Sequence, residues 1–184
     1  MTTRMTDDAR CALRFRTATR ADVDPIVALV HSAYRGESSR AGWTTEADLL
    51  DGQRTDAEEV CELIALPDSQ IVLCERDTGL VASAHIQKQA ESGYFGMFAV
   101  RPGTQRQGIG SALLVEVERH AREALGCASM HMSVITLRAE LIAWYERRGY
   151  RRTGLFKPFP YGQERYGQPR RDDLRMELLQ KPLR

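Results

Sequence analysis

The chain lacks any excess of charge of one sign. Its 184 residues include 26 Lys and Arg against 25 Asp and Glu, so the formal net charge is +1. Proteins that hold nucleic acid or an anionic membrane through bulk charge carry a clear basic field. The sequence therefore predicts neither a nucleic-acid partner nor a membrane partner.

Long apolar runs and paired cysteines are also lacking. The longest apolar runs, such as Ala112–Val115, are far shorter than the roughly 20 residues of a transmembrane helix. The first residues are polar, with no apolar stretch of the signal-peptide type. The four cysteines lie far apart, form no C-x-x-C pair and have no histidine at zinc-like spacing. These absences predict a cytoplasmic protein with reduced, mostly buried thiols and no metal site.

Apolar residues, by contrast, are frequent enough for a real core. They make up 42% of the chain, and a domain of this length buries roughly 70% of its unfolded surface. This composition excludes a wholly disordered chain. With no internal repeat and no linker-like stretch, we expect a polar, frayed leader over residues 1–12 and a single domain over 13–184.

The periodicity of apolar residues predicts an alternation of strands and helices. Alternation with period two predicts strands over 13–17 and 129–135. Two runs joined by a tight turn, 71–75 and 80–86, and the apolar run 94–100 predict three more, and short strands are expected over 150–155 and 174–179. Helical spacing predicts helices beginning near 23 and covering 56–66, 111–125 and 137–148. Thr19 and Asp22 have the spacing of a capping box before the first helix, and Thr136 is expected to cap the last one.

The segment Val100-Arg-Pro-Gly-Thr-Gln-Arg-Gln-Gly-Ile-Gly-Ser111 joins a buried strand to a helix. Glycines at such a junction let backbone N–H groups converge on an anion, and the helix N-terminus adds its positive dipole end. A P-loop would need Lys and Ser or Thr directly after Gly108, where Ile109 and Gly110 stand. A dinucleotide fingerprint would need a glycine at the position of Leu113. The turn therefore predicts a phosphate site of another type.

Gln105-x-x-Gly108-x-Gly110 resembles the acetyl-CoA signature Q/R-x-x-G-x-G/A of the GNAT superfamily of N-acetyltransferases. Two further features lie where that family has them. One is the preceding apolar strand that ends in Met97-Phe-Ala-Val100, and the other is Trp144-Tyr-Glu-Arg-Arg-Gly-Tyr150, which looks like the family segment A-x-x-x-Y-x-x-x-G-F/Y. The resemblance covers residues 13–155 in element order and 94–150 in motif detail.

The resemblance implies a single α/β domain with a mixed, mostly antiparallel sheet flanked by helices and a CoA cleft between two splayed parallel strands. It implies transfer of the acetyl group of acetyl-CoA to a primary amine by direct attack, with no metal. The acceptor stays open between small-molecule and protein amines, and a homodimer is compatible with the resemblance. The residues implied for acetyl-CoA are Phe98, Val100, Gln105, Arg106, Gln107, Gly108, Ile109, Gly110, Ser111 and Arg138.

Tyr145 is the residue to which the resemblance gives a catalytic role. A phenol within hydrogen-bond reach of the thioester sulfur can stabilise or protonate the departing thiolate. The alternative is an aromatic side chain that only packs its helix on the sheet. Many family members carry Asn seven residues earlier, where this chain has Arg138. Arg138 shares a helical face with Tyr145, and it either reaches the cofactor or is solvated in the first turn.

The general base is not identified by the resemblance, because the strand 94–100 lacks the Glu that family members often place there. Its alternatives are a water chain or one of five side chains, which are His85, His131, Glu37, Glu46 and Glu91. If no base exists, the second reading of the chain is a non-catalytic acyl-CoA sensor. The irregular stretches 34–45 and 156–173 are expected to bind the acceptor, through Glu37, Trp43 and Tyr161.

Overall fold

The computed structural model describes residues 12–35, 39–40, 46–163 and 167–183. The predicted leader lies almost wholly outside these residues, as do Glu37 and Trp43. In chain order the elements are β1 (Arg14–Thr17), the 3-10 turn η2 (Arg20–Asp22), α1 (Val23–Tyr34), β2 (Leu50–Asp51), α3 (Ala57–Ala65), β3 (Ser69–Arg76), β4 (Gly79–Gln89), β5 (Ser92–Val100), α4 (Ile109–Glu123), β6 (Ser129–Ile135), α5 (Ala139–Glu146), β7 (Arg151–Pro158), β8 (Gln168–Pro169) and β9 (Arg175–Pro182).

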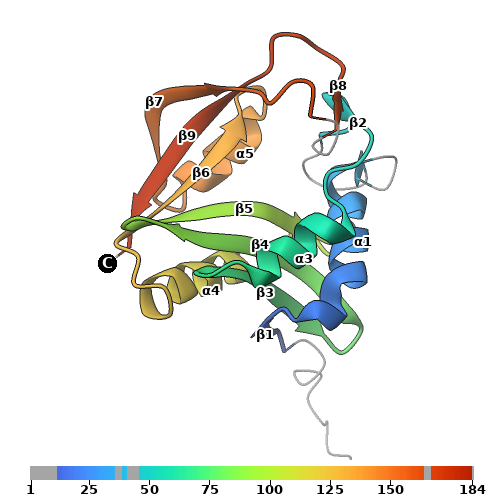
Figure 1. Cartoon of the computed structure of the whole chain (residues 1–184), viewed down its shortest axis with the longest axis vertical. Coiled ribbons are helices and arrows are strands. Elements are labelled where there is room, and N and C mark those ends of the chain that lie inside the picture. The colour runs from blue at the N-terminus through green and yellow to red at the C-terminus, as the bar shows by residue number, and fades with distance from the viewer. Residues whose placement is uncertain (1–11, 36–38, 41–45, 164–166, 184) are drawn as a thin grey trace, which may run out of the picture.

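Seven strands form one sheet in the order β1-β3-β4-β5-β6-β9-β7 (Figure 1). Every neighbouring pair in it is antiparallel except β5 with β6, which is parallel. The short strands β2 and β8 pair separately. The chain is therefore a single α/β domain with a mixed, mostly antiparallel sheet, which confirms the predicted fold class.

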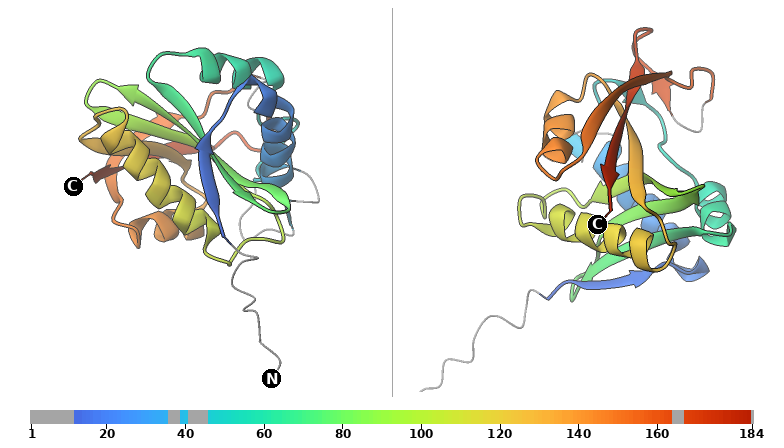
Figure 2. Two further views of the ribbon diagram at one scale, coloured as in Figure 1. Left: turned by 90° about the horizontal axis from the view of Figure 1, so that it is seen from below. Right: turned by 90° about the vertical axis from the view of Figure 1, so that its left-hand side faces the viewer.

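The strands of the first half of the sheet are covered on both faces. Along β3, Val72 and Cys74 belong to the core cluster that contains the apolar face of α4, whereas Ile71 and Leu73 belong to the cluster of α1 and α3. This division follows from the period of two in a strand. Figure 2 shows α4 on one side of these strands and α1 and α3 on the other. Cys74 and Cys127 are buried and Cys61 is half-buried, and all three thiols are free.

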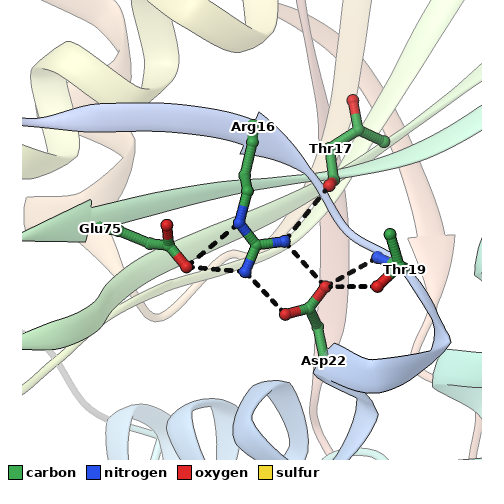
Figure 3. Close-up of polar contacts among 5 residues, drawn as sticks. All are labelled: Arg16, Thr17, Thr19, Asp22 and Glu75. Carbon is green, nitrogen blue, oxygen red and sulfur yellow. Dashed lines mark hydrogen bonds and ion pairs between the residues drawn. The ribbon is translucent and has the colours of Figure 1, made fainter.

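A network around Arg16 fixes the first strand to the rest of the sheet (Figure 3). The Arg16 guanidinium donates to Glu75 of β3 at 2.7 Å and to both carboxylate oxygens of Asp22 at 2.7 and 2.8 Å. Asp22 in turn accepts from the backbone N–H of Thr19 at 2.8 Å, which confirms the predicted capping box. The hydrogen bond from Arg16 holds the pKa of the Asp22 carboxyl far below its usual range.

Two element boundaries differ from those predicted. The last helix begins at Ala139 rather than near Leu137, and Arg138 rather than Thr136 occupies its N-cap position. Thr136 is instead tied by its N–H to the carbonyl of Arg175 on the neighbouring strand. The strand predicted over 150–155 extends to Pro158, because its edge pairs with β9 as far as Arg175. This extension shortens the irregular segment that was predicted to begin at Phe156.

Candidate functional site

The sheet opens between its two parallel strands. β5 pairs with β6 over three residues, Ser92–Tyr94 against Ser129–His131. Beyond Tyr94, β5 follows β4 across a bulge, where Met97 has a φ of 46°. A bulge bends the strand that contains it, so β5 turns away from β6. Figure 1 shows the two strands diverging, which confirms the predicted splay.

The glycine turn lies at the end of β5 that faces this opening. Gly103, Arg106 and Gly108 have φ values of 83°, 65° and 79°, so the chain reverses sharply before α4 begins at Ile109. The first N–H groups of a helix have no partner within the helix, so those at the start of α4 are able to bind a ligand. A Cβ at Gly110 would lie 3.4 Å from the Phe98 ring. The absence of that carbon keeps the space between the helix start and β5 clear.

A cavity of about 480 Å³, the turn cavity, lies over this glycine turn. Most of the residues predicted for acetyl-CoA line it: Phe98, Val100, Gln105, Arg106, Gly108, Gly110, Ser111 and Arg138. Two do not. Ile109 is 1% exposed and packs in the core, and the side chain of Gln107 accepts a hydrogen bond from Arg76 at 2.7 Å. Neither of these two residues lines the turn cavity.

The end of α5 adds cationic side chains to the turn cavity that the motif does not contain. Arg147 and Arg148 both line it. The Arg148 guanidinium lies 3.5 Å from the centroid of the Trp144 ring and donates to the Ser111 hydroxyl at 2.6 Å. The pair directly before Gly149 was the available signal, and only the fold brings it to the glycine turn.

Tyr145 is 3% exposed, and its ring packs edge-on against Trp144, Phe95 and Tyr150. Among the residues that the structure describes, the Tyr145 hydroxyl has no hydrogen-bond partner. Burial raises the pKa of Tyr145 well above its usual value, so the phenol is protonated at neutral pH. The side chain is thus able to donate a hydrogen bond and unable to act as a base.

A second cavity of about 440 Å³, the charged cavity, lies beside the first. Its walls come from α1, from the segment before α3, from β4, β5 and β6, and from the chain after β7. Its ionisable side chains are Arg35, Arg54, Arg138, Glu46, Glu59, His85, Tyr34, Tyr94 and Tyr145.

Glu46 lies between two arginines at the wall of the charged cavity. Its carboxylate accepts from Arg35 at 2.7 Å and from Arg138 at 2.8 Å, and all three side chains are nearly buried. Burial alone would raise the pKa of Glu46, but the two guanidiniums outweigh it and hold the pKa below its usual range. Glu46 is therefore a weak base. The solvated alternative for Arg138 is wrong, because its side chain is 10% exposed and bound to Glu46.

The other candidate bases are poorly suited as well. His85 lines the charged cavity, hydrogen bonds with the Ser69 hydroxyl at 2.9 Å, and has its pKa lowered by burial to about 4. His131 hydrogen bonds with Ser92 at 2.8 Å and lines neither cavity, and burial lowers its pKa too. Glu91 is exposed in the turn between β4 and β5, away from both cavities.

Of the residues predicted to bind the acceptor, Tyr161 is described, and it does not line the charged cavity. Glu37 and Trp43 lie outside the described residues. The Tyr161 hydroxyl donates to the carbonyl of Arg171 and accepts from the N–H of Leu174 at 2.8 Å, so it closes its own loop. The neighbouring Phe159 and Pro160 line the charged cavity instead.

The two cavities meet at the sheet opening. Five residues line both: Tyr34, Phe98, Arg138, Leu141 and Tyr145. The Tyr34 hydroxyl donates to the carbonyl oxygen of Phe98 at 2.7 Å, which ties α1 to the part of β5 that has left β6. Sequence reasoning missed Tyr34, because nothing in its helical spacing distinguishes it from a core position.

This chain is an α/β domain whose sheet opens beside a glycine turn, and that architecture is the GNAT fold. Among solved structures with this fold is the ribosomal-protein-S18-alanine N-acetyltransferase from Escherichia coli, with a TM-score of 0.69 and 16% identity over 94% of both chains. Another is the ribosomal-protein-alanine N-acetyltransferase from Brucella melitensis, with a TM-score of 0.69 and 21% identity over 92% of this chain and 99% of that one. Nourseothricin acetyltransferase has a TM-score of 0.67 and 19% identity over 95% of this chain and 100% of that one.

The sequence also matches a family model. Residues 67–152 match the model of the acetyltransferase (GNAT) domain. No curated protein matches the sequence. The matched range begins just before β3 and ends in β7, so it includes the glycine turn and Tyr145 but not Tyr34, Glu46 or Arg54.

The described residues lack two features that would change the interpretation of the site. No helix among them is long and apolar enough to cross a membrane. No cluster of three or more His, Cys, Asp or Glu side chains in that part of the chain is arranged to hold a metal ion.

Proposed function

We propose that the protein transfers the acetyl group of acetyl-CoA to a primary amine. The observation that carries this proposal is the meeting of the turn cavity and the charged cavity at five shared residues. A reaction between two substrates by direct attack needs two binding spaces that join where the reacting atoms meet. The fold likeness to N-acetyltransferases supports the same reaction class.

The turn cavity fits the phosphates of CoA. The free N–H groups at the start of α4 attract an anion, and Gly108 lets the backbone approach it closely. Arg106, Arg147 and Arg148 at the same cavity supply positive charge for further phosphate oxygens. Acetyl-CoA would supply an acetyl group activated as a thioester. The chain's own residues bind and orient it, with Phe98 and Val100 forming the wall on the β5 side.

In the reaction, the lone pair of a neutral amine attacks the carbonyl carbon of the acetyl group. A C–N bond forms, the C–S bond breaks, and the bonding electrons leave with sulfur. The amine nitrogen loses one proton to solvent and the thiolate gains one, so the products are an N-acetyl amide and the free thiol of CoA. Tyr145 donates a hydrogen bond to the departing sulfur. Because its pKa is raised above that of an ordinary thiol, the phenol stabilises the thiolate without giving up its proton completely.

Replacing Tyr145 with Phe tests this role. Tyr145→Phe keeps the aromatic packing and removes the hydroxyl, so turnover should fall roughly 10- to 100-fold, the value of one charge-assisted hydrogen bond. Free thiol released from acetyl-CoA is measured with a broad panel of amines under conditions where chemistry limits the rate. Acetyl-CoA affinity, measured by calorimetry, should stay within about threefold.

Tyr150→Phe is the matched control. Tyr150 is buried in the same aromatic cluster, and its hydroxyl donates to Glu118 at 3.1 Å, but it lines neither cavity. This variant should lose some stability and keep its turnover. Equal turnover in the wild type and Tyr145→Phe would overturn the assignment of Tyr145.

A second candidate function is a non-catalytic acyl-CoA sensor. It is favoured by one observation: Glu46 and His85, the candidate bases that line the charged cavity, both have lowered pKa values. The amine panel distinguishes the two candidates. Acetyl-CoA that binds and is never cleaved with any amine would favour the sensor, whereas thiol release with a single acceptor excludes it.

A further inference from the structure

The charged cavity carries more positive than negative charge. Three guanidiniums, those of Arg35, Arg54 and Arg138, line it together with two carboxylates, those of Glu46 and Glu59. His85 adds no charge at neutral pH because burial lowers its pKa to about 4. Among the described residues the lining therefore has one cation in excess, which favours an anionic group on the ligand.

Arg54 is the arginine of this lining that has no carboxylate within ion-pair distance among the described residues. Arg35 and Arg138 both contact Glu46, at 2.7 and 2.8 Å. The Glu59 carboxylate accepts from the Thr55 hydroxyl at 2.6 Å. The Arg54 guanidinium lies over the Tyr34 ring, 5.4 Å from its centroid, and forms no hydrogen bond or ion pair with any residue that the structure describes.

The side chain of Tyr34 connects Arg54 to the place where the two cavities meet. Tyr34, which lies under Arg54, also lines the turn cavity and donates its hydroxyl to Phe98 at the sheet opening. A ligand group bound at Arg54 is thus held one aromatic ring away from the place where the two cavities meet. This distance suits a small molecule that carries an anionic group and a reactive amine close together.

We propose that the acceptor is a small amine that carries a carboxylate, as an amino acid does, and that Arg54 binds this carboxylate. The planar guanidinium offers two parallel N–H donors that match the two oxygens of a carboxylate. The volume of the charged cavity, about 440 Å³, is that of a small-molecule site. This inference rests on the proposed acetyl transfer and specifies its acceptor.

The excess charge also distinguishes between classes of amine. It makes the charged cavity unfavourable for a polyamine, whose several ammonium groups would be repelled. A carboxylate bound at Arg54 neutralises the excess, so the acceptor amine loses its proton to solvent before it attacks.

The test compares acceptors that differ only in the carboxylate. Thiol release from acetyl-CoA is measured for a panel of amino acids, for the amide of each, and for spermidine. We expect kcat/KM for the preferred amino acid to exceed that for its amide by roughly 10- to 100-fold, the value of a charge-assisted pair. Arg54→Gln should abolish this preference by raising KM for the amino acid. KM for the amide and for acetyl-CoA should not change.

Two further variants make the result specific. Arg54→Lys keeps the charge and loses the planar fork, so its preference should lie between those of the wild type and Arg54→Gln. Arg14→Gln removes one guanidinium from β1, where the side chain is 67% exposed and lies outside both cavities, and should keep the full preference.

Each outcome is decisive. Preference for amides or for spermidine, or an Arg54→Gln variant that still prefers the amino acid, overturns the inference while leaving acetyl transfer intact. If no acceptor releases thiol, the proposed function fails. The carboxylate site is then judged by calorimetric titration of the amino acids into the CoA-loaded protein. Binding that Arg54→Gln weakens at least tenfold supports the site, and equal or absent binding refutes it.

Discussion

The two cavities on either side of the sheet opening are built in different ways. About half of the lining of the turn cavity comes from one stretch of chain, residues 98–111, whose path is shaped by glycines. The charged cavity comes from segments scattered between residues 34 and 176, and charged side chains form its polar part. A backbone site depends on local conformation, whereas a side-chain site depends on packing between distant segments. The first is therefore visible in a sequence motif and the second is not.

The largest expected effect falls on the charged cavity. Glu46→Gln removes the carboxylate that Arg35 and Arg138 share and leaves buried guanidiniums facing one another. Breaking a buried ion pair from one side costs about 3–5 kcal/mol, so the free energy of unfolding should fall by that amount. Urea denaturation near pH 7 measures the loss.

The matched control for Glu46→Gln is Glu123→Gln. Glu123 also contacts two arginines, Arg119 and Arg122, but its side chain is 50% exposed at the end of α4. Exposed pairs are screened by solvent, so this variant should lose at most about 0.5 kcal/mol. Similar losses in both variants would mean that the Glu46 cluster is as solvated as the surface and that the contrast between the cavities is overstated.

A smaller effect concerns pH. Burial lowers the pKa of His85 from its ordinary value of 6.5 to about 4. Below pH 6.5 the unfolded chain takes up a proton at this position and the folded one does not, so stability falls as pH falls through this window. Between pH 7 and 4.5 the loss from His85 should be about 2–3 kcal/mol.

His85→Gln isolates that contribution. The variant keeps a group able to hydrogen bond with Ser69 and removes the titration. The difference in unfolding free energy between the wild type and the variant should shrink as the pH is lowered from 7 to 4.5. If the two pH profiles run parallel, His85 is protonated normally and the charged cavity is more open to water than its burial indicates.

The smallest expected effect falls on the turn cavity. Gly108 has φ 79°, and a Cβ there would meet nothing within 4 Å, so Gly108→Ala changes backbone conformation alone. An alanine in this left-handed conformation costs about 1 kcal/mol. Thermal unfolding should show that loss, and KM for acetyl-CoA should rise because the turn is displaced.

Gly110→Ala is the companion variant for stability. Gly110 lies in the first turn of α4 without a positive φ, and its added Cβ would meet the Phe98 ring at 3.4 Å, an ordinary contact. Alanine in a helix is favourable, so stability should hold or rise slightly. A loss as large as that of Gly108→Ala would contradict a conformational role for Gly108.

The sequence predicted the parts that depend on local pattern. The capping box at Thr19 and Asp22 and the strands on either side of the turn follow from local pattern, whereas the splay of β5 from β6 was implied by the family resemblance. Local rules described Arg138 only in part. They left it either solvated or facing the cofactor; its side chain is not solvated, because it lines the turn cavity and also binds Glu46, 92 residues earlier.

The charged cavity could not be predicted for the same reason. The Tyr34 hydroxyl reaches the carbonyl of Phe98 across 64 residues of chain, and no periodicity links the two positions. Arg54 stands in a short polar segment before α3, where a charged residue is ordinarily solvated. Tyr34, Arg54 and Phe98 line the same cavity only because α1 and α3 pack against β5.

The divergence of β5 from β6 also bears on how the domain resists unfolding. The described sheet has two halves, β1-β3-β4-β5 and β6-β9-β7. They are joined only by the pairing of β5 with β6, which extends over three residue pairs. A molecule lodged in the opening would bridge these halves where the backbone does not. It would bind the closed sheet and not the unfolded chain, so the melting temperature should report how much of the opening is filled. The opening between β5 and β6 that can bind a ligand thus also makes the stability of the domain depend on whether a ligand is bound there.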